Sequence, residues 1–564
     1  MSMSFDAIVI GSGMSGGWAA KELTERGLKT LVIERGRHIE HGSDYTDSLS
    51  PWEIDNYGQV SEAEIEADYE VQSKCYAFSA ANKHFWAKDS DHPYSTPEDK
   101  PFYWIRGYHL GGRSLMWARQ SYRLSEMDFE SNAKDGYGTD WPIRYADMAP
   151  WYDHVETFAG ISGSAEGLPQ LPDGKYLPPM ALTPVEAEFG RKMQAAFPTR
   201  RLITGRCAHL TAPTPEHEAL GRGPCQYRSL CERGCSYGAY FSSLSATLPA
   251  AKNTGNLTIV TDAIAHSIIH DPKTGKASGV RLIDQNTKAG TVYEAKLIFL
   301  CASTIGTAQI LLTSTSDAFP TGLANRSDMV GRNLTDHISG MGASGTYPGF
   351  DDIYHHGRRP NGFYVPRYRN VTEPGDGYTR GFGFQGRGLR SGWQRGIGEP
   401  GTGAALKARL RKPGPWTLNL NGFGEMMPRP ENRVTLHPTR TDKWGIPIPH
   451  IDVELGPQDR KMIDQASADA RTMLEMAGCT DIVQYKHYGG LGLGIHEMGT
   501  ARMGKDPKTS VLNGHNQAHD VPNLFITDGS CMASSGCQNP SLTYMAMSAR
   551  GAHHAVELLR AGKA

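Results

Sequence analysis

Residues 5–16 read FDAIVIGSGMSG, and this stretch decides the fold. Its first six residues form an apolar run broken by a single Asp, which is typical of a buried parallel strand. The three glycines that follow have the spacing Gly-x-Gly-x-x-Gly, and a helical pattern leads from them to Gly27. A second apolar strand is expected at 30–33. The segment therefore predicts a β-α-β unit that opens an α/β domain.

Each glycine of this unit has a role in holding a dinucleotide. Gly11 permits the tight turn, Gly13 lets the backbone approach a pyrophosphate, and Gly16 lets helix and strand pack closely. The N-terminus of the helix offers unpaired N–H groups to the phosphates. Glu34 ends the second strand, where its carboxylate can accept hydrogen bonds from ribose hydroxyls. FAD and NAD share this fingerprint, so the motif alone leaves both open.

The composition is that of a soluble globular protein with more than one structural part. The chain has 564 residues, of which 39% are hydrophobic and 21% charged. Lys and Arg (58) nearly balance Asp and Glu (60), so no global field attracts nucleic acid or an acidic membrane. Residues 297–316 carry no charge but include eight Ser, Thr or Gln. They predict a buried strand followed by a helix, and no transmembrane segment.

Further apolar runs predict the rest of the α/β domain. Strands are expected at 256–260, 279–283, 297–301 and 523–527, the first two joined by a turn region at 271–275. Helices are expected to begin at Ile305 and at Pro540. Residues 379–415, rich in Gly, Arg and Lys, predict a long solvated loop or lid, with a partner-docking surface as the alternative.

Less regular stretches interrupt these elements, which predicts two interleaved domains. The dinucleotide-binding domain is assigned residues 1–45, 100–150, 205–340 and 490–564. The substrate-binding domain is assigned residues 46–99, 151–204 and 341–489.

Three more blocks accompany the first glycine motif. They are GYHLGGRSLMW at 107–117, HEMGTARMG at 496–504, and the pair NLFITDGS and NPSLT at 523–530 and 539–543. In this order, and over nearly the whole length, the blocks resemble the glucose–methanol–choline (GMC) family of flavin oxidoreductases. The likeness is greatest to its pyranose oxidases and sugar dehydrogenases, including the glucoside 3-dehydrogenases. It implies FAD, a discontinuous Rossmann-like FAD-binding domain, and a substrate domain with an antiparallel sheet over the flavin.

The resemblance also assigns cofactor contacts. Asp528 and Gly529 match the position that contacts the phosphate–ribitol part of the flavin. Met116 stands where pyranose 2-oxidases carry a histidine joined covalently to FAD, so we expect non-covalent FAD here. The residues expected at the cofactor are Gly11, Gly13, Ser15, Gly16, Glu34, Arg35, Gly111, Gly112, Ser114, Met116, Asp528, Gly529, Pro540 and Leu542.

Oxidation of an alcohol needs a base for the hydroxyl proton while a hydride leaves for flavin N5, and histidine suits the first task. The resemblance places His496 on the catalytic histidine of the family and Asn539 on its partner. Each residue also has a structural interpretation. His496 would be a satisfied core or surface histidine, and Asn539 a helix N-cap with Pro540 at the first helical position. Such a helix would aim its positive end at the flavin.

Three of the nine cysteines gather within eleven residues. Cys225, Cys231 and Cys235 have the spacing C-x5-C-x3-C, which matches neither zinc sites nor the usual ferredoxin run. Spacing alone favours structural thiols. The resemblance adds a second hypothesis, an iron–sulfur cluster held by these three thiols, with Cys207 as a weaker fourth ligand. Nearby arginines would raise the potential of such a cluster.

These observations predict an FAD-dependent dehydrogenase that oxidises a ring hydroxyl of a sugar or glycoside and passes electrons to a protein or quinone acceptor. The alternatives are an oxidase of the same family that uses oxygen, and a catalytically idle flavin-fold subunit. A small subunit and a cytochrome are the expected partners, and nucleic acid is not. No charged-then-apolar leader is seen, which favours the cytoplasm, whereas export with a partner subunit would place the chain in the periplasm.

Overall fold

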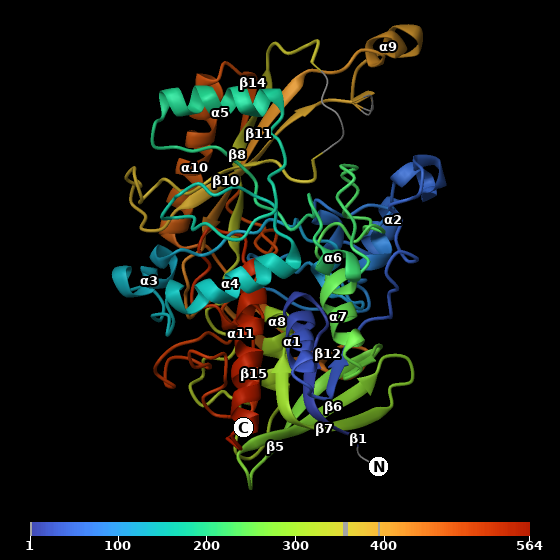
Figure 1. The fold of residues 1–564 in the computed structure, drawn as a ribbon, viewed down its shortest axis with the longest axis vertical. Coiled ribbons are helices and arrows are strands. Elements are labelled where there is room, and N and C mark those ends of the chain that lie inside the picture. Colours follow the sequence, from blue (N-terminus) through green and yellow to red (C-terminus); the bar gives the residue numbers. More distant parts are fainter. Residues whose placement is uncertain (1–2, 354–358, 393–394, 397, 564) are drawn as a thin grey trace.

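Two β-sheets lie one above the other along the long axis of the molecule (Figure 1). The structure is a computed structural model that describes residues 3–353, 359–392, 395–396 and 398–563. Positions 1–2, 354–358, 393–394, 397 and 564 lie outside the described residues. They belong to the predicted domains, and 393–394 and 397 also to the predicted 379–415 loop.

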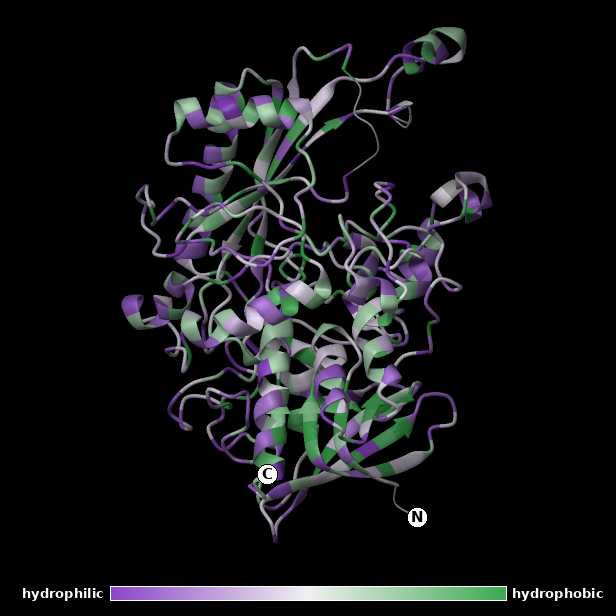
Figure 2. Ribbon diagram, in the orientation of Figure 1, coloured by the Kyte–Doolittle hydropathy of each residue, from purple (hydrophilic) through white to green (hydrophobic). Residues whose placement is uncertain are grey.

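The lower sheet has seven strands and carries the glycine motif. In spatial order they are β4 (Leu257–Val260), β2 (Thr30–Ile33), β1 (Met3–Ile10), β7 (Gly290–Leu300), β6 (Lys276–Asp284) and β5 (Ala263–Asp271), with β15 (Leu524–Ile526) beside β7. Strands β4, β2, β1, β7 and β15 are parallel, whereas β5 and β6 are antiparallel. Helices cover this sheet, and β2 is buried along its whole length. The strands are strongly hydrophobic (Figure 2), as buried parallel strands require.

Three helices begin at the carboxyl edge of this sheet. Helix α1 (Met14–Glu25) follows β1, α8 (Thr304–Thr313) follows β7, and α11 (Ser541–Arg560) lies against α1. The uncharged stretch 297–316 supplies the end of β7 and all of α8, as predicted. In the described part of the chain, no helix combines the length and apolarity that a membrane crossing requires. The helix N-termini meet where open α/β sheets bind their ligands.

The upper sheet has six antiparallel strands. They are β14 (Thr480–Lys486), β8 (His337–Tyr347), β11 (Trp416–Glu425), β10 (Phe382–Arg390), β9 (Phe363–Val365) and β3 (Ile203–Thr204). Helices α10 (Pro457–Met476) and α5 (Pro184–Ala196) cover one face (Figure 1). Along β11, buried Leu418 and Leu420 alternate with half-buried Asn419 and Asn421, so the opposite face is polar. The predicted fold class, a Rossmann-like α/β part with a second part built on an antiparallel sheet, is confirmed.

Shorter elements lie between the strands of the two sheets along the chain. The helices are α2 (Glu62–Asp68), α3 (Glu126–Asp135), α4 (Tyr145–Ala159), α6 (Pro215–Ala219), α7 (Leu248–Asn253) and α9 (Gly403–Leu410), and the strands β12 (Arg433–Thr441) and β13 (Pro447–Asp452) form a hairpin. All strands of the lower sheet lie within 1–45, 205–340 and 490–564, and most of the upper sheet lies within 341–489. The domain boundaries themselves stay a prediction.

Two predictions of local structure are wrong. The turn after Asp271 joins β5 to β6, and strand β5 itself was missed because polar residues such as His266 interrupt its apolar pattern. Residues 379–415 are not one solvated loop, since they include β10 and α9. The glycines of β10 concealed that strand. A Cβ on Gly386 would lie 2.2 Å from the Phe363 ring, so glycine is required there for close strand packing.

Candidate active site

One cavity of about 1070 Å³ joins the glycine motif of the lower sheet to the polar face of the upper sheet. Its lining runs from Gly11 and Glu34 at one end to His496, Asn539 and Gln385 at the other. Pockets for single small ligands are commonly about 300–1,000 Å³. The cavity is therefore at the upper end of that range, and it is long enough to be lined by both the glycine motif and His496.

The glycine motif has the geometry of a phosphate cradle. Gly11 has φ +98°, and a Cβ there would lie 2.3 Å from the carbonyl oxygen of Cys301. A Cβ on Gly16 would lie 1.8 Å from the carbonyl oxygen of Gly11, so only glycine lets α1 start so close to β1. The first turn of α1 faces the cavity at Gly13, Met14 and Ser15. These contacts fit the pyrophosphate of FAD.

Glu34 is held in place at the end of β2. One carboxylate oxygen accepts hydrogen bonds from the Ser12 hydroxyl (2.6 Å) and the Ser12 backbone N–H (3.2 Å), and the other accepts from the Gly36 N–H (2.9 Å). Burial raises the pKa of this carboxyl above its ordinary value. The carboxylate retains acceptor capacity toward the cavity, as a ribose contact requires.

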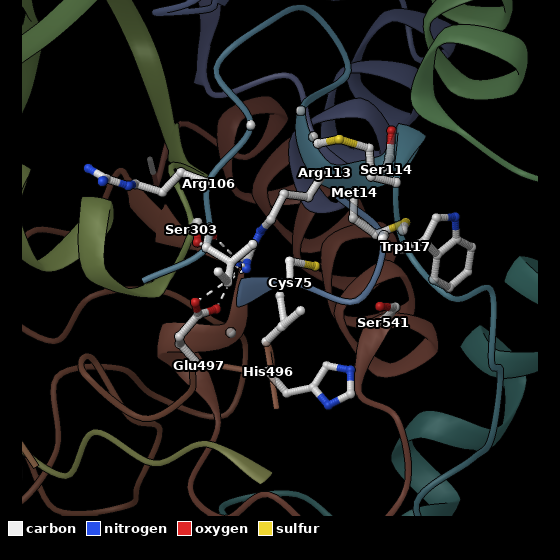
Figure 3. Close-up of a pocket in the computed structure, with 18 of the residues that line it drawn as sticks. Met14, Cys75, Arg106, Arg113, Ser114, Trp117, Ser303, His496, Glu497 and Ser541 are labelled. Carbon is white, nitrogen blue, oxygen red and sulfur yellow. Dashed lines mark hydrogen bonds and ion pairs between the residues drawn. The ribbon is translucent and has the colours of Figure 1, made fainter. Parts of the chain in front are cut away.

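Most of the predicted site residues meet in this cavity. Those that line it are Gly11, Gly13, Ser15, Glu34, Arg35, Gly112, Ser114, Met116, His496, Asp528, Gly529 and Asn539. Four others do not line it: Gly16, Gly111, Pro540 and Leu542. Gly16 and Gly111 shape the backbone instead. Leu542 faces the core, and Ser541 rather than its neighbours reaches the cavity (Figure 3).

The loop that carries His496 is fixed by a buried carboxylate. Asp336 accepts hydrogen bonds from the backbone N–H groups of Gly494 (3.0 Å), His496 (2.8 Å) and His337 (2.7 Å). Ile495 adopts φ +60°, a left-handed conformation that is unusual for a β-branched residue. Burial and then nearby Glu497 raise the pKa of Asp336 to about 7. The backbone before His496 is thus tightly determined.

A chain of hydrogen bonds ends at His496. His337 donates from Nε2 to the Gly536 carbonyl (2.9 Å), because a carbonyl oxygen can only accept. Neutral His337 then accepts at Nδ1 from Nδ1–H of His496, 3.0 Å away. His496 is left with its lone pair on Nε2, 3.5 Å from the Asn539 amide nitrogen. Gln385 donates to the amide oxygen of Asn539 (2.6 Å), which turns the Asn539 N–H group toward His496.

The electrostatic surroundings keep both imidazoles neutral. Burial lowers the pKa of His337 to about 4. Burial, then His337 and Arg113, lower the pKa of His496 well below its ordinary value. A neutral His496 with an unprotonated Nε2 can accept a proton from a hydroxyl group that displaces the long contact with Asn539.

The prediction that Asn539 is a helix N-cap is wrong. Pro540 occupies the N-cap position of α11, with helical backbone angles, and no side chain caps the helix. The amide of Asn539 is instead engaged by Gln385 and His496. Helix α11 begins one residue later than predicted, with its N-terminus still beside the cavity.

Family models described as GMC oxidoreductase match residues 5–339 and 428–548. The chain belongs to the GMC oxidoreductase family. Members of the family bind FAD, in keeping with the cradle and with Glu34.

Two relatives and one solved structure are similar to this GMC chain over nearly its whole length. Fructose dehydrogenase large subunit from Gluconobacter japonicus is 25% identical, over 100% of this chain and 99% of that protein. The 2-methyl-1,2-propanediol dehydrogenase from Mycolicibacterium austroafricanum is 28% identical, over 97% and 94%. The crystal structure of pyridoxine 4-oxidase from Mesorbium loti matches with a TM-score of 0.59 and 17% identity, over 98% and 99% of the two chains.

This GMC chain also has a buried ion pair that the sequence did not reveal. Arg113, within the second glycine block, binds Glu497 through two hydrogen bonds (2.8 and 3.2 Å) and donates to Ser303 (3.2 Å) (Figure 3). Glu497 is almost completely buried, so the pair fixes a neutralised charge beside His496. It ties the second glycine block to the loop that carries His496.

The predicted iron–sulfur ligands are not supported. Among the described residues, no three His, Cys, Asp or Glu side chains are grouped so that they could hold a metal ion. Cys231 Sγ lies 3.6 Å from His209 Nε2, and Cys207 lies 3.3 Å from the Ser162 hydroxyl. Burial raises the pKa of Cys225 to about 11 and that of Cys231 to about 12. Together with Cys235, these residues are free thiols in the structure, the interpretation that spacing alone favoured.

Several residues that line or support the cavity were not predicted from the sequence. His337 carries no local signal, because its partner lies 159 residues away. Gln385 and Arg387 on β10 face the cavity beside Asn419 and Asn421 on β11, with registers Gln385–Asn421 and Arg387–Asn419. The period-2 alternation of β11 was available in the sequence and predicts its polar face.

Proposed function

We propose that this chain is the catalytic subunit of an FAD-dependent dehydrogenase that oxidises a ring hydroxyl of a sugar or glycoside to a ketone. The observation that carries the proposal is the directed hydrogen-bond chain from the Gly536 carbonyl through His337 to His496, which presents an unprotonated Nε2 to the cavity.

His496 and Asn539 act on the substrate hydroxyl in different ways. His496 takes the hydroxyl proton at Nε2, and the Asn539 amide N–H donates to the substrate oxygen, on which negative charge develops. Nδ1–H of the protonated His496 remains bound to Nδ1 of His337. FAD, if bound in the cradle at Gly11–Gly16 and Glu34 without a covalent bond, would supply the hydride acceptor.

The polar face of the upper sheet suits a substrate rich in hydroxyl groups. Three amide side chains, Gln385, Asn419 and Asn421, line the cavity, and Tyr485 joins them. Amides donate and accept, so they can satisfy hydroxyls of either orientation. A sugar agrees with this lining and with the substrate in the name of the fructose dehydrogenase large subunit.

Oxidases are also similar to this chain, among them pyridoxine 4-oxidase, but for the electron acceptor we follow the two sequence relatives reported above. Both are named dehydrogenases, and the one named a large subunit gives precedent for a partner subunit. We infer a small subunit, a cytochrome or quinone as electron acceptor, export to the periplasm with that subunit, and the activity of a glucoside 3-dehydrogenase.

Flavin reduction under anaerobic conditions tests the proposal. A panel of sugars and glycosides is mixed with the oxidised holoenzyme, and bleaching of the flavin absorbance identifies substrates. NMR of the product locates the new ketone. Turnover with an artificial dye and little hydrogen peroxide in air is expected, whereas peroxide formation at the rate of dye reduction would identify an oxidase. Absence of bleaching by every carbohydrate, despite bound FAD, would leave an idle flavin-fold subunit.

A further inference from the structure

Arg387 is a cation in the cavity without an acidic partner. Its guanidinium donates one hydrogen bond, to the carbonyl of Pro360 (3.0 Å), and within the described residues it makes no ion pair closer than 4.0 Å. Its stem lies over Gly362, where a Cβ would approach Arg387 Cγ to 2.6 Å. Most of the five N–H donors of the side chain are therefore left for a ligand.

The charges around Arg387 leave it unmatched. Glu232 is the carboxylate that acts on it at longer range, but Glu232 is paired with Arg119 at 3.3 Å. Arg359, also close, is paired with Glu186 at 2.6 Å. Three guanidinium groups thus face two carboxylates. The pKa of Arg387 is lowered, first because the cavity walls desolvate it.

Binding of a substrate would raise the free energy of the unpaired charge on Arg387. Although the cavity walls partly desolvate Arg387, its side chain is exposed, so solvent can reach it when the cavity holds no ligand. A substrate that fills the cavity displaces this solvent, and a buried guanidinium without a counter-charge is strongly unfavourable. A neutral substrate would leave the charge unpaired, whereas an anionic one would supply the missing partner.

The position of Arg387 relative to the reacting end fixes where the anion lies. Gln385, which binds Asn539, precedes Arg387 by two residues on β10, so both side chains point from the same face of the sheet about 7 Å apart. A molecule with its reacting hydroxyl at His496 and Asn539 can extend along β10 toward Arg387. The anionic group is then several bonds from the oxidised carbon.

A side cavity adds to the positive field. It has a volume of about 380 Å³ and shares Asn361, Gly362 and Arg387 with the main cavity. Of its described lining residues, six are Arg or Lys and a single one, Glu186, is acidic. Charges of one sign along a cleft raise the local concentration of oppositely charged ligands.

We propose that the substrate is an anionic sugar or glycoside, whose carboxylate or phosphate group binds Arg387 while its hydroxyl is oxidised at His496. The inference rests on the proposed function and names the substrate class of that same site. Arg387 is a specificity residue in this scheme, and takes no part in proton or hydride transfer.

Matched substrates test the assignment on the FAD-loaded enzyme. Glucose, glucuronate and glucose 6-phosphate share a ring and differ in charge, and the last two separate carboxylate from phosphate recognition. We expect the wild type to oxidise one of the anions with a kcat/KM about 10²-fold or more above that of glucose. Arg387→Gln should remove this preference mainly through KM, and Arg387→Lys should retain part of it. Arg191→Gln, which changes an exposed arginine on α5, is the matched control and should leave the preference unchanged.

Equal kcat/KM for glucose and the anions, or an anion preference that survives in Arg387→Gln, would overturn the assignment. A direct binding measurement keeps this result separate from a failure of the proposed function. If no carbohydrate bleaches the flavin, each anion is titrated into oxidised holoenzyme and the flavin absorbance is followed. Binding to the wild type that is lost in Arg387→Gln would support the anion site without the sugar reaction. Absence of binding of both anions to the wild type would overturn it.

Discussion

Nδ1 of His337 lies 3.0 Å from Nδ1 of His496, with the two rings almost perpendicular at 86°. The Gly536 carbonyl fixes the proton of His337 on Nε2, so the shared hydrogen must belong to His496. His337 is therefore a positioning residue. It selects the tautomer in which Nε2 of His496 is unprotonated, and it does so from the first residue of strand β8.

Replacement of His337 by Leu should slow substrate oxidation about 10²-fold, because His496 then loses the acceptor that holds its productive tautomer. Anaerobic flavin reduction measures the effect. His337→Asn, which can offer an amide oxygen to Nδ1–H of His496, should recover part of the rate. Equal rates for the Leu and Asn variants would show that His337 acts through packing alone.

His496→Ala should lower the rate of flavin reduction about 10²–10⁴-fold, the share of a positioned base. FAD content should not change, because the cradle at Gly11–Gly16 and Glu34 belongs to other segments. Rapid mixing with the best substrate gives the rate, and the absorbance ratio of flavin to protein gives the content. Turnover close to that of the wild type would mean that the proton leaves by another route.

The flavin should be released by acid precipitation, and the yellow colour should appear in the supernatant. Met116 at the predicted attachment position is a thioether, which forms no such bond under ordinary conditions. Cys75 is a second cavity residue to consider (Figure 3). Burial raises the pKa of its thiol to about 11, so little thiolate is present at neutral pH. Colour that stays with the precipitated wild type but not with precipitated Cys75→Ser would instead identify a cysteinyl link.

The first half of the site could be predicted from sequence because its signals are local. Strand, glycine turn, helix and Glu34 lie within about thirty residues, and each has a stereochemical reason that a single sequence displays. His337 and Arg387 have no such signal, since their roles depend on partners brought close by the two sheets. The glycines of β10 resembled loop composition, whereas in the sheet they admit the ring of Phe363. Prediction failed where the reason for a residue lies in a distant contact.

The pH dependence of kcat/KM should show a neutral His496 throughout the physiological range. Burial, His337 and Arg113 lower the pKa of His496, so the base form persists as the pH falls through 6.5, the ordinary value for histidine. We therefore expect the acid limb of His496 below pH 6, whereas Asp336, whose pKa is about 7, is the group of the site that titrates between pH 8 and pH 6. An acid limb centred at or above pH 6.5 that persists in Asp336→Asn would contradict this assignment.

Asn539→Asp should move that acid limb upward. A carboxylate in place of the amide, whose nitrogen is 3.5 Å from Nε2, favours the imidazolium, and an opposite charge at such a distance shifts a pKa by about 1–3 units. Because His496 acts as the base, a higher pKa leaves less of its neutral form at low pH. The ratio of kcat/KM at pH 6 to that at pH 8 should therefore fall. Asn539→Ala is the matched control. It also loses the N–H donor and should also be slow, but it adds no charge and should keep the pH profile of the wild type. Identical profiles for the Asp and Ala variants would show that the group titrating in the acid limb is not next to Asn539.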